Sequence, residues 1–163
     1  MDAVREGSEA AYATLFERHR AGLYGYAVRM TRQPEAADDV FQESFLRVHR
    51  ARATWSSHEG SFRSWLYRIA TNAVRDRVRA AARRPEVLGE AWEPYVHANH
   101  TERLELERAL AELPDTLREA FVLTAVLGMD HNEVAAALDI SPDNARARVS
   151  RARVRLRELL EVS

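Results

Sequence analysis

The sequence predicts an all-α protein built from two small helical domains joined by a flexible linker. Apolar residues recur at helical spacing along most of the 163 residues, and glycine and proline are scarce, at 6 and 5 residues, which argues against a fold rich in tight turns. This periodicity fails between residues 85 and 100, where two prolines, one glycine and three glutamates occur. We therefore expect a first domain at 1–84, a linker at 85–100 and a second domain at 101–163.

Three helices account for the first domain. Residues 10–30 form an amphipathic pattern, and a second pattern over 34–53 begins with a proline, which is favoured in a first helical turn. The polar residues 54–60 predict a loop. Ser61 can then cap a third helix that continues to about residue 84, because a serine hydroxyl accepts a hydrogen bond from a free amide of the first turn.

The second domain ends in a pattern typical of a helix-turn-helix. A helix over 101–113 is followed by one that starts at Pro114, and the glycine-containing residues 128–130 break the pattern. A short helix over 131–138 then leads through a three-residue turn to a long helix that Ser141 and Pro142 begin. This order of a short helix, a turn and a longer helix favours DNA binding, although a plain helical hairpin has the same outline.

The charge is distributed in blocks, although the net charge is only -1. All 24 basic residues are arginines. Residues 51–84 carry a net charge of +6 and residues 144–163 carry +4, whereas residues 85–143 carry -10. Two basic segments on either side of an acidic spacer favour two separate contacts with a polyanion.

The third helix has an arginine-rich face. At 100° per residue, five polar side chains fall on one side of it: Arg68, Asn72, Arg75, Arg79 and Arg83. Trp65 lies at the border between this face and the apolar face, where an indole can stack on an unpaired base. The simpler alternative is a solvated arginine face with Trp65 in the core.

The chain resembles bacterial RNA polymerase sigma factors of the extracytoplasmic-function (ECF) group. Residues 37–48 are similar to the polymerase-binding helix of that family, and residues 62–70 with the following arginines are similar to its helix for the -10 promoter element. Leu113-Pro114, Arg118-Glu119 and residues 150–153 are similar to the domain that binds the -35 element. The family usually has glycine in the turn where Asp139 stands, but aspartate tolerates the left-handed backbone conformation better than most residues.

The resemblance implies a sigma factor that binds core RNA polymerase and directs promoter recognition, DNA melting and transcription initiation. The residues that it assigns to core polymerase are Asp38, Asp39, Gln42, Glu43, Phe45 and Arg47. Those that it assigns to the -10 element are Trp65, Arg68, Asn72, Arg75, Asp76 and Arg79. Those that it assigns to the -35 element are Asn144, Arg146, Arg148, Ser150 and Arg151. An anti-sigma factor is the usual regulator of the family.

Other classes of protein fit less well. The chain has no cysteine, no glycine-rich phosphate loop and no nucleophile motif, so we expect no enzyme, and we expect neither a cofactor nor a metal. No apolar run is long enough to span a membrane, which favours a cytoplasmic protein without membrane insertion. A sigma-like decoy that binds an anti-sigma factor without recognising promoters remains the main alternative, but the arginine faces that such a decoy would lose are kept.

Overall fold

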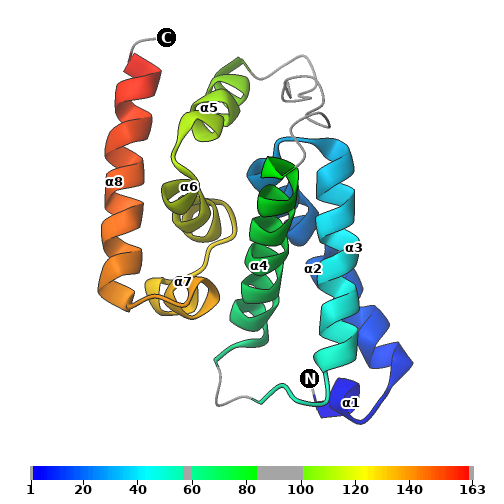
Figure 1. The fold of residues 1–163 in the computed structure, drawn as a ribbon. Coiled ribbons are helices and arrows are strands. Elements are labelled where there is room, and N and C mark those ends of the chain that lie inside the picture. Colours follow the sequence, from blue (N-terminus) through cyan, green and yellow to red (C-terminus); the bar gives the residue numbers. More distant parts are fainter. Residues whose placement is uncertain (1, 57–59, 84–100, 162–163) are drawn as a thin grey trace.

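The computed structural model describes residues 2–56, 60–83 and 101–161, and all regular structure in these ranges is helical (Figure 1). The predicted linker and residues 57–59 of the predicted loop lie outside the described residues. In chain order the helices are α1 (Asp2–Arg5), α2 (Glu9–Thr31), α3 (Pro34–Ala51), α4 (Phe62–Ala82), α5 (Thr101–Glu112), α6 (Asp115–Phe121), the π-helix Val122–Val126, α7 (His131–Leu138) and α8 (Pro142–Glu161). In the described part of the chain, none of these helices is both long and apolar enough to cross a bilayer.

The predicted helix starts are confirmed by their caps. The Ser61 hydroxyl accepts a hydrogen bond from the Ser64 N–H at 3.1 Å, and the Ser141 hydroxyl accepts one from the Asn144 N–H at 3.2 Å. Pro34 lies in the first turn of α3. The sequence analysis did not identify the capping box at α7, where the Asp130 carboxylate accepts from the Glu133 N–H and the Glu133 carboxylate accepts from the Asp130 N–H.

The turn of the helix-turn-helix has the predicted backbone conformation. Asp139 ends α7 with φ 55° and ψ 51°, which is the left-handed region, and its N–H donates to the Ala135 carbonyl. Ala135 is 4% exposed, so a small side chain lies where α7 and α8 approach each other. The stripe predicted on α8 is also present, with Ala145, Val149, Ala152 and Leu156 buried.

The two halves of the chain, residues 2–83 and 101–161, pack against each other and share a large apolar cluster, beside a smaller one between α5 and α8. We had expected the acidic segment to hold two domains apart. Instead, α4 lies between α3 on one side and α6 and α7 on the other (Figure 1). Leu23 and Leu66 of the amino-terminal half and Val134 of the carboxyl-terminal half are fully buried in the same cluster.

A buried arginine organises the carboxyl-terminal half. Arg118 is 3% exposed, and its guanidinium donates hydrogen bonds to the carbonyls of Leu110, Ala111 and Leu113. These carbonyls are at the carboxyl end of α5 and just after it, where a helix has no internal donors for them. Arg118 therefore caps α5 and fixes the corner between α5 and α6, which the sequence analysis did not foresee.

The left-handed turn predicts the effect of glycine at position 139. Glycine adopts φ 55° without the steric cost that a Cβ atom brings, although its more flexible unfolded chain offsets part of the gain. We expect Asp139→Gly to raise the free energy of unfolding by about 0.5–1 kcal/mol and Asp139→Val to lower it by at least about 1 kcal/mol. Urea denaturation followed by circular dichroism measures both variants. A glycine variant less stable than the parent would contradict this account of the turn.

Candidate functional site

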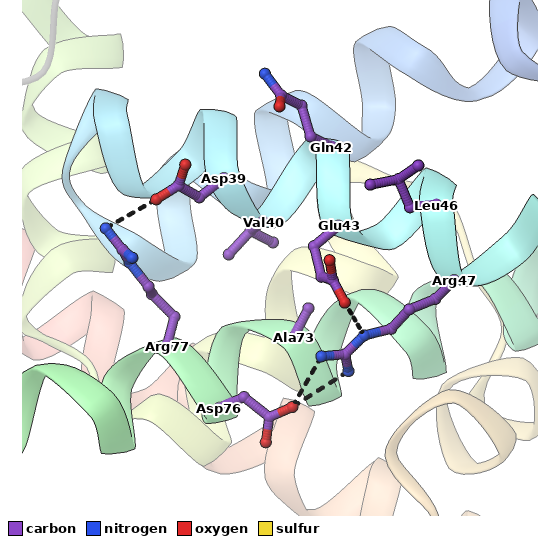
Figure 2. Close-up of a pocket in the computed structure, with 9 residues that line it drawn as sticks. All are labelled: Asp39, Val40, Gln42, Glu43, Leu46, Arg47, Ala73, Asp76 and Arg77. Carbon is purple, nitrogen blue, oxygen red and sulfur yellow. Dashed lines mark hydrogen bonds and ion pairs between the residues drawn. The ribbon is translucent and has the colours of Figure 1, made fainter.

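A polar groove runs between α3 and α4 (Figure 2). It has a volume of about 360 Å³ and is lined by Asp39, Val40, Gln42, Glu43, Leu46, Arg47, Ala73, Asp76 and Arg77. Asp39 and Leu46 each lie three or four residues from both Gln42 and Glu43, so one face of α3 supplies all four. The floor of the groove is apolar, because Val40 and Ala73 are buried.

Ion pairs cross the groove and set its charge pattern. Arg77 contacts Asp39 at 2.9 Å, and Arg47 contacts both Glu43 at 2.7 Å and Asp76 at 3.2 Å (Figure 2). Hydrogen bonds from Arg79 and Arg47 hold the pKa of Asp76 below its ordinary value. All of these side chains are at least one-third exposed, so the pairs stabilise the fold little and can exchange for contacts with a partner.

Most of the residues expected to bind polymerase line this groove or lie beside it. Asp38, Asp39 and Gln42 are exposed. Phe45 is the exception, because it is 5% exposed and its ring packs against Phe16 with 4.5 Å between the centroids. The expectation that Phe45 contacts a partner is therefore wrong.

An exposed apolar side chain at this surface is that of Leu46, which is 49% exposed. The sequence analysis missed Leu46, although its spacing of seven residues from Asp39 places both on one helical face.

The residues predicted for the -10 element are only partly brought together. Asn72, Asp76 and Arg79 are exposed on α4, and Arg68 is partly buried. Arg75 is held by Glu119 of α6, as described below.

Trp65 does not lie at the border of an open face. Its side chain is 6% exposed, and it packs against Phe62 and Trp55 with centroid distances of 5.8 and 6.5 Å. The prediction of a stacking platform at Trp65 is therefore wrong for this arrangement, and the simpler alternative of a core residue is correct.

Three arginines of the amino-terminal half form ion pairs with glutamates of the carboxyl-terminal half. Arg63 contacts Glu133 at 2.5 Å, Arg75 contacts Glu119 at 2.8 Å, and Arg29 contacts Glu107 at 2.5 Å. Both N–H groups used by Arg75 reach the two oxygens of Glu119, whose side chain is only 5% exposed.

The pKa of Glu133 reflects its pairing with Arg63. Burial acts to raise this pKa, but hydrogen bonds from Arg63 and from the Asp130 N–H outweigh burial, so the pKa lies below its ordinary value. Glu133 is therefore ionised at neutral pH, where it attracts Arg63 across the interface. The sequence analysis named none of these three ion pairs, since nothing in the sequence showed that the two halves touch.

The open surface of α8 is strongly basic. The helix packs on α5, α6 and α7 through its buried stripe (Figure 1). The arginines outside that stripe are exposed, except for the partly buried Arg148. Arg146 contacts Asp143 at 2.9 Å, and Arg148 donates to the Asn144 side chain at 3.1 Å. Ser150 and Arg151 are exposed one turn further along. The residues expected to bind the -35 element therefore lie on both flanks of the buried stripe of α8, with Asn144, Arg148 and Arg151 on one side and Arg146 and Ser150 on the other.

Known protein families match both halves of the chain. The model of sigma-70 region 2 matches residues 15–84, and the model of sigma-70 region 4 matches residues 103–156. The sequence is 36% identical to the RNA polymerase sigma factor CarQ of Myxococcus xanthus, over 98% of this chain and 95% of CarQ. It is 34% identical to the ECF RNA polymerase sigma factor SigM of Mycobacterium tuberculosis, over 94% of this chain and 79% of SigM.

Solved structures agree with the fold. CnrH, solved in complex with the cytosolic domain of CnrY, superposes with a TM-score of 0.77 at 30% identity, over 99% of this chain and 95% of CnrH. The sigma factor RpoE of Bartonella quintana, solved with the anti-sigma factor NepR, has the same fold, with a TM-score of 0.78 at 24% identity over 94% of this chain and 98% of RpoE.

The burial of Trp65 predicts a structural role for its ring. Removing a buried indole leaves a cavity, so we expect Trp65→Ala to lower the free energy of unfolding by about 3–5 kcal/mol. Chemical denaturation measures this loss. The exposed Asn72→Ala, on the same helix, is the matched control and should change stability by less than about 0.5 kcal/mol. If the Trp65→Ala variant were as stable as the parent, that result would contradict the burial of the Trp65 ring in the core.

Proposed function

The chain belongs to the ECF group of bacterial RNA polymerase sigma factors. On that premise we propose which of its surfaces bind core polymerase and which bind promoter DNA. It is a sigma factor, which binds core RNA polymerase and promoter DNA and directs the start of transcription. Members of this family regulate transcription and are not catalysts. We propose that this chain likewise has no catalytic activity and that it works in the cytoplasm, where polymerase and DNA meet.

The groove between α3 and α4 is the proposed docking surface for core polymerase. Its support is an exposed leucine, Leu46, among polar side chains of α3 that are exposed or partly exposed: Asp38, Asp39, Gln42, Glu43 and Arg47. An apolar anchor surrounded by charges is the usual composition of a specific protein interface. Phe45 contributes to this surface indirectly, because its buried ring packs in the core and fixes the position of α3.

Promoter contacts are proposed for α4 and α8, so that residues 1–84 and 101–163 form two DNA-binding domains connected by residues 85–100. On α8, Asn144, Arg146 and Arg148 are near the start of the helix that a helix-turn-helix inserts into the major groove, and Ser150 and Arg151 are next to them. On α4, Asn72 can contact a base edge while Arg68 and Arg79 contact phosphates, and Asp76 orients Arg79. The single observation that carries this proposal is the exposed arginine surface of α8.

An anti-sigma factor is a further proposed partner. The support is that CnrH, 30% identical to this chain, was solved with a second protein, the cytosolic domain of CnrY. The alternative of a decoy that binds such a regulator without DNA is less well supported, because α8 keeps the exposed arginines that DNA binding requires.

Transcription in vitro with purified core polymerase on a promoter library tests the function as a whole. We expect start sites that share one pair of -35 and -10 elements. Transcripts without shared elements, or no transcripts above core polymerase alone, would count against the proposal.

The docking groove predicts the effect of reversing one charge. Asp39→Arg places a cation beside Arg77 and repels basic groups of a partner, so we expect binding to core polymerase to weaken about tenfold with helicity unchanged. Fluorescence anisotropy with labelled protein measures the affinity. Glu17→Arg, an exposed position of α2 outside the groove, is the control. An unaltered affinity of Asp39→Arg would remove the groove from the docking surface.

The α8 surface predicts selective loss at the -35 element. A side chain that reads a base edge contributes about 1–3 kcal/mol of discrimination, so Arg146→Ala should lower initiation about tenfold or more at a promoter with an intact -35 element. At a promoter whose -35 element is scrambled, the same substitution should have little further effect. The matched control is Arg157→Ala, near the other end of α8. Equal losses at both promoters would mean that Arg146 contacts only phosphate.

A further inference from the structure

The side of α8 that faces away from the core carries an apolar ridge between two rows of mostly arginine side chains. One row contains Asn144, Arg148, Arg151 and Arg155, and the other contains Arg146, Ser150, Arg153 and Arg157. At 100° per residue, Ala147 and Val154 lie about 160° and 180° from the buried Ala145. These two residues therefore form a ridge opposite the buried stripe, and one arginine row lies on each side of them.

The ridge is accessible to a partner. Ala147 is exposed and Val154 is 51% exposed, and α8 lies at the edge of the molecule (Figure 1). Two acids also lie near the ridge, but each pairs with an arginine of a neighbouring row: Asp143 contacts Arg146 at 2.9 Å, and Glu158 contacts Arg155 at 2.9 Å. Between the rows, α8 thus presents uncharged, apolar side chains.

The dimensions of helix and groove determine what each part of this surface contacts. An α-helix with its side chains is about 10–12 Å in diameter, and the major groove of B-form DNA is about 12 Å wide. A helix that enters the groove therefore fills it. The two arginine rows then lie against the two sugar-phosphate strands, and the ridge faces the floor of the groove, where the base edges are exposed.

Ala147 is the ridge residue that lies near the base edges. It is in the second turn of α8, and residues near the start of such a recognition helix contact the bases. Val154 lies seven residues further along, or about 10 Å at 1.5 Å per residue. In addition, Arg151 donates to the Ala147 carbonyl at 3.3 Å, which holds a long side chain beside the methyl group of Ala147 while Ala147 itself stays exposed.

The chemistry of the groove floor selects the base that an alanine methyl group can contact. Every base pair presents hydrogen-bonding groups there, and the 5-methyl group of thymine is the apolar group among them. A methyl group placed against a polar base edge would remove water from that edge without replacing its hydrogen bond. Placed against the thymine methyl group, it instead buries apolar surface, which is favourable.

We propose that Ala147 is a specificity-determining residue that contacts the 5-methyl group of a thymine in the -35 element. This inference rests on the proposed function, because it takes α8 as the helix that enters the major groove at that element. The arginine rows supply affinity through the phosphates, whereas Ala147 supplies a preference for one base at one position.

Replacement of thymine by deoxyuridine tests this contact, because deoxyuridine pairs as thymine does and lacks only the methyl group. The full-length chain is assembled with core polymerase and bound to a promoter that the library assay selects. Each thymine of the -35 element, on either strand, is then replaced in turn. Since burial of one methyl-sized group is lost, we expect one replacement to weaken binding about fourfold. Competition against the unmodified duplex measures the ratio of affinities.

Ala147→Gly assigns that methyl contact to Ala147. This variant should bind the thymine and deoxyuridine duplexes with affinities that differ by less than about twofold, because it has no methyl group to lose a partner. Val154→Gly is the matched control, since it places glycine on the same ridge of the same helix and keeps Ala147. It should retain the fourfold loss of the parent. Should Ala147→Gly lose helicity, Ala147→Ser places a hydroxyl group against the thymine methyl group and should likewise reduce the difference.

Three outcomes would overturn the proposal. They are selected promoters with no thymine in the shared -35 element, a promoter to which binding is unchanged by every deoxyuridine replacement, and an Ala147→Gly variant that keeps the fourfold loss of the parent. A failure of the proposed function is distinguishable from these, because the library assay would then yield no shared -35 element at all. The comparison of thymine with deoxyuridine on a bound promoter concerns Ala147 alone.

Discussion

The packing of α4 between two layers of helices is the constraint on which the rest of the structure depends. On one side α4 packs against α2 and α3, and on the other side against α7. Its amino-terminal part is therefore buried on nearly all sides, which explains the run of buried residues Ser64, Trp65, Leu66 and Tyr67. Only the later turns, from Asn72 onward, expose a polar surface. One helix thus forms a wall of the groove proposed for polymerase, part of the proposed DNA surface and the centre of the contact between the halves.

Charge complementarity within the chain explains why a nearly neutral protein can carry strongly basic and acidic segments. The basic residues 51–84 supply Arg63 and Arg75, and the acidic residues 85–143 supply the glutamates that pair with them. The acidic segment is therefore more than a spacer, because it neutralises part of the basic surface. Among the described residues, Arg146 and Arg155 of α8 pair with Asp143 and Glu158 of the same helix, and both arginines are exposed. The two basic surfaces consequently differ in whether their ion pairs reach the other half of the chain or stay within one helix.

Local signals predicted the helices and their caps, whereas contacts between distant parts of the chain could not be predicted. Serine caps, prolines at first turns and the left-handed Asp139 depend on neighbouring residues, so the sequence contains them directly. Trp65 was misplaced because a helical projection assumes one buried face, and α4 has two. Phe45 was predicted at the surface position that Leu46 occupies, for a similar reason. Adjacent residues of a helix point only about 100° apart, and tertiary packing determines which of them is buried. The π-helix Val122–Val126 and the carbonyl contacts of Arg118 depend on tertiary packing, and no spacing in the sequence indicated them.

Small-angle X-ray scattering of the free chain tests most directly whether the two halves are held together. A closed molecule should scatter with a radius of gyration of about 15 Å, as expected for one compact body of 163 residues. Two halves that move independently would instead give a value above about 20 Å, with a long tail in the distance distribution. The compact value would support the shared core of residues 2–83 and 101–161 in the free chain. The larger value would contradict that account, even if the chain proved fully active in transcription.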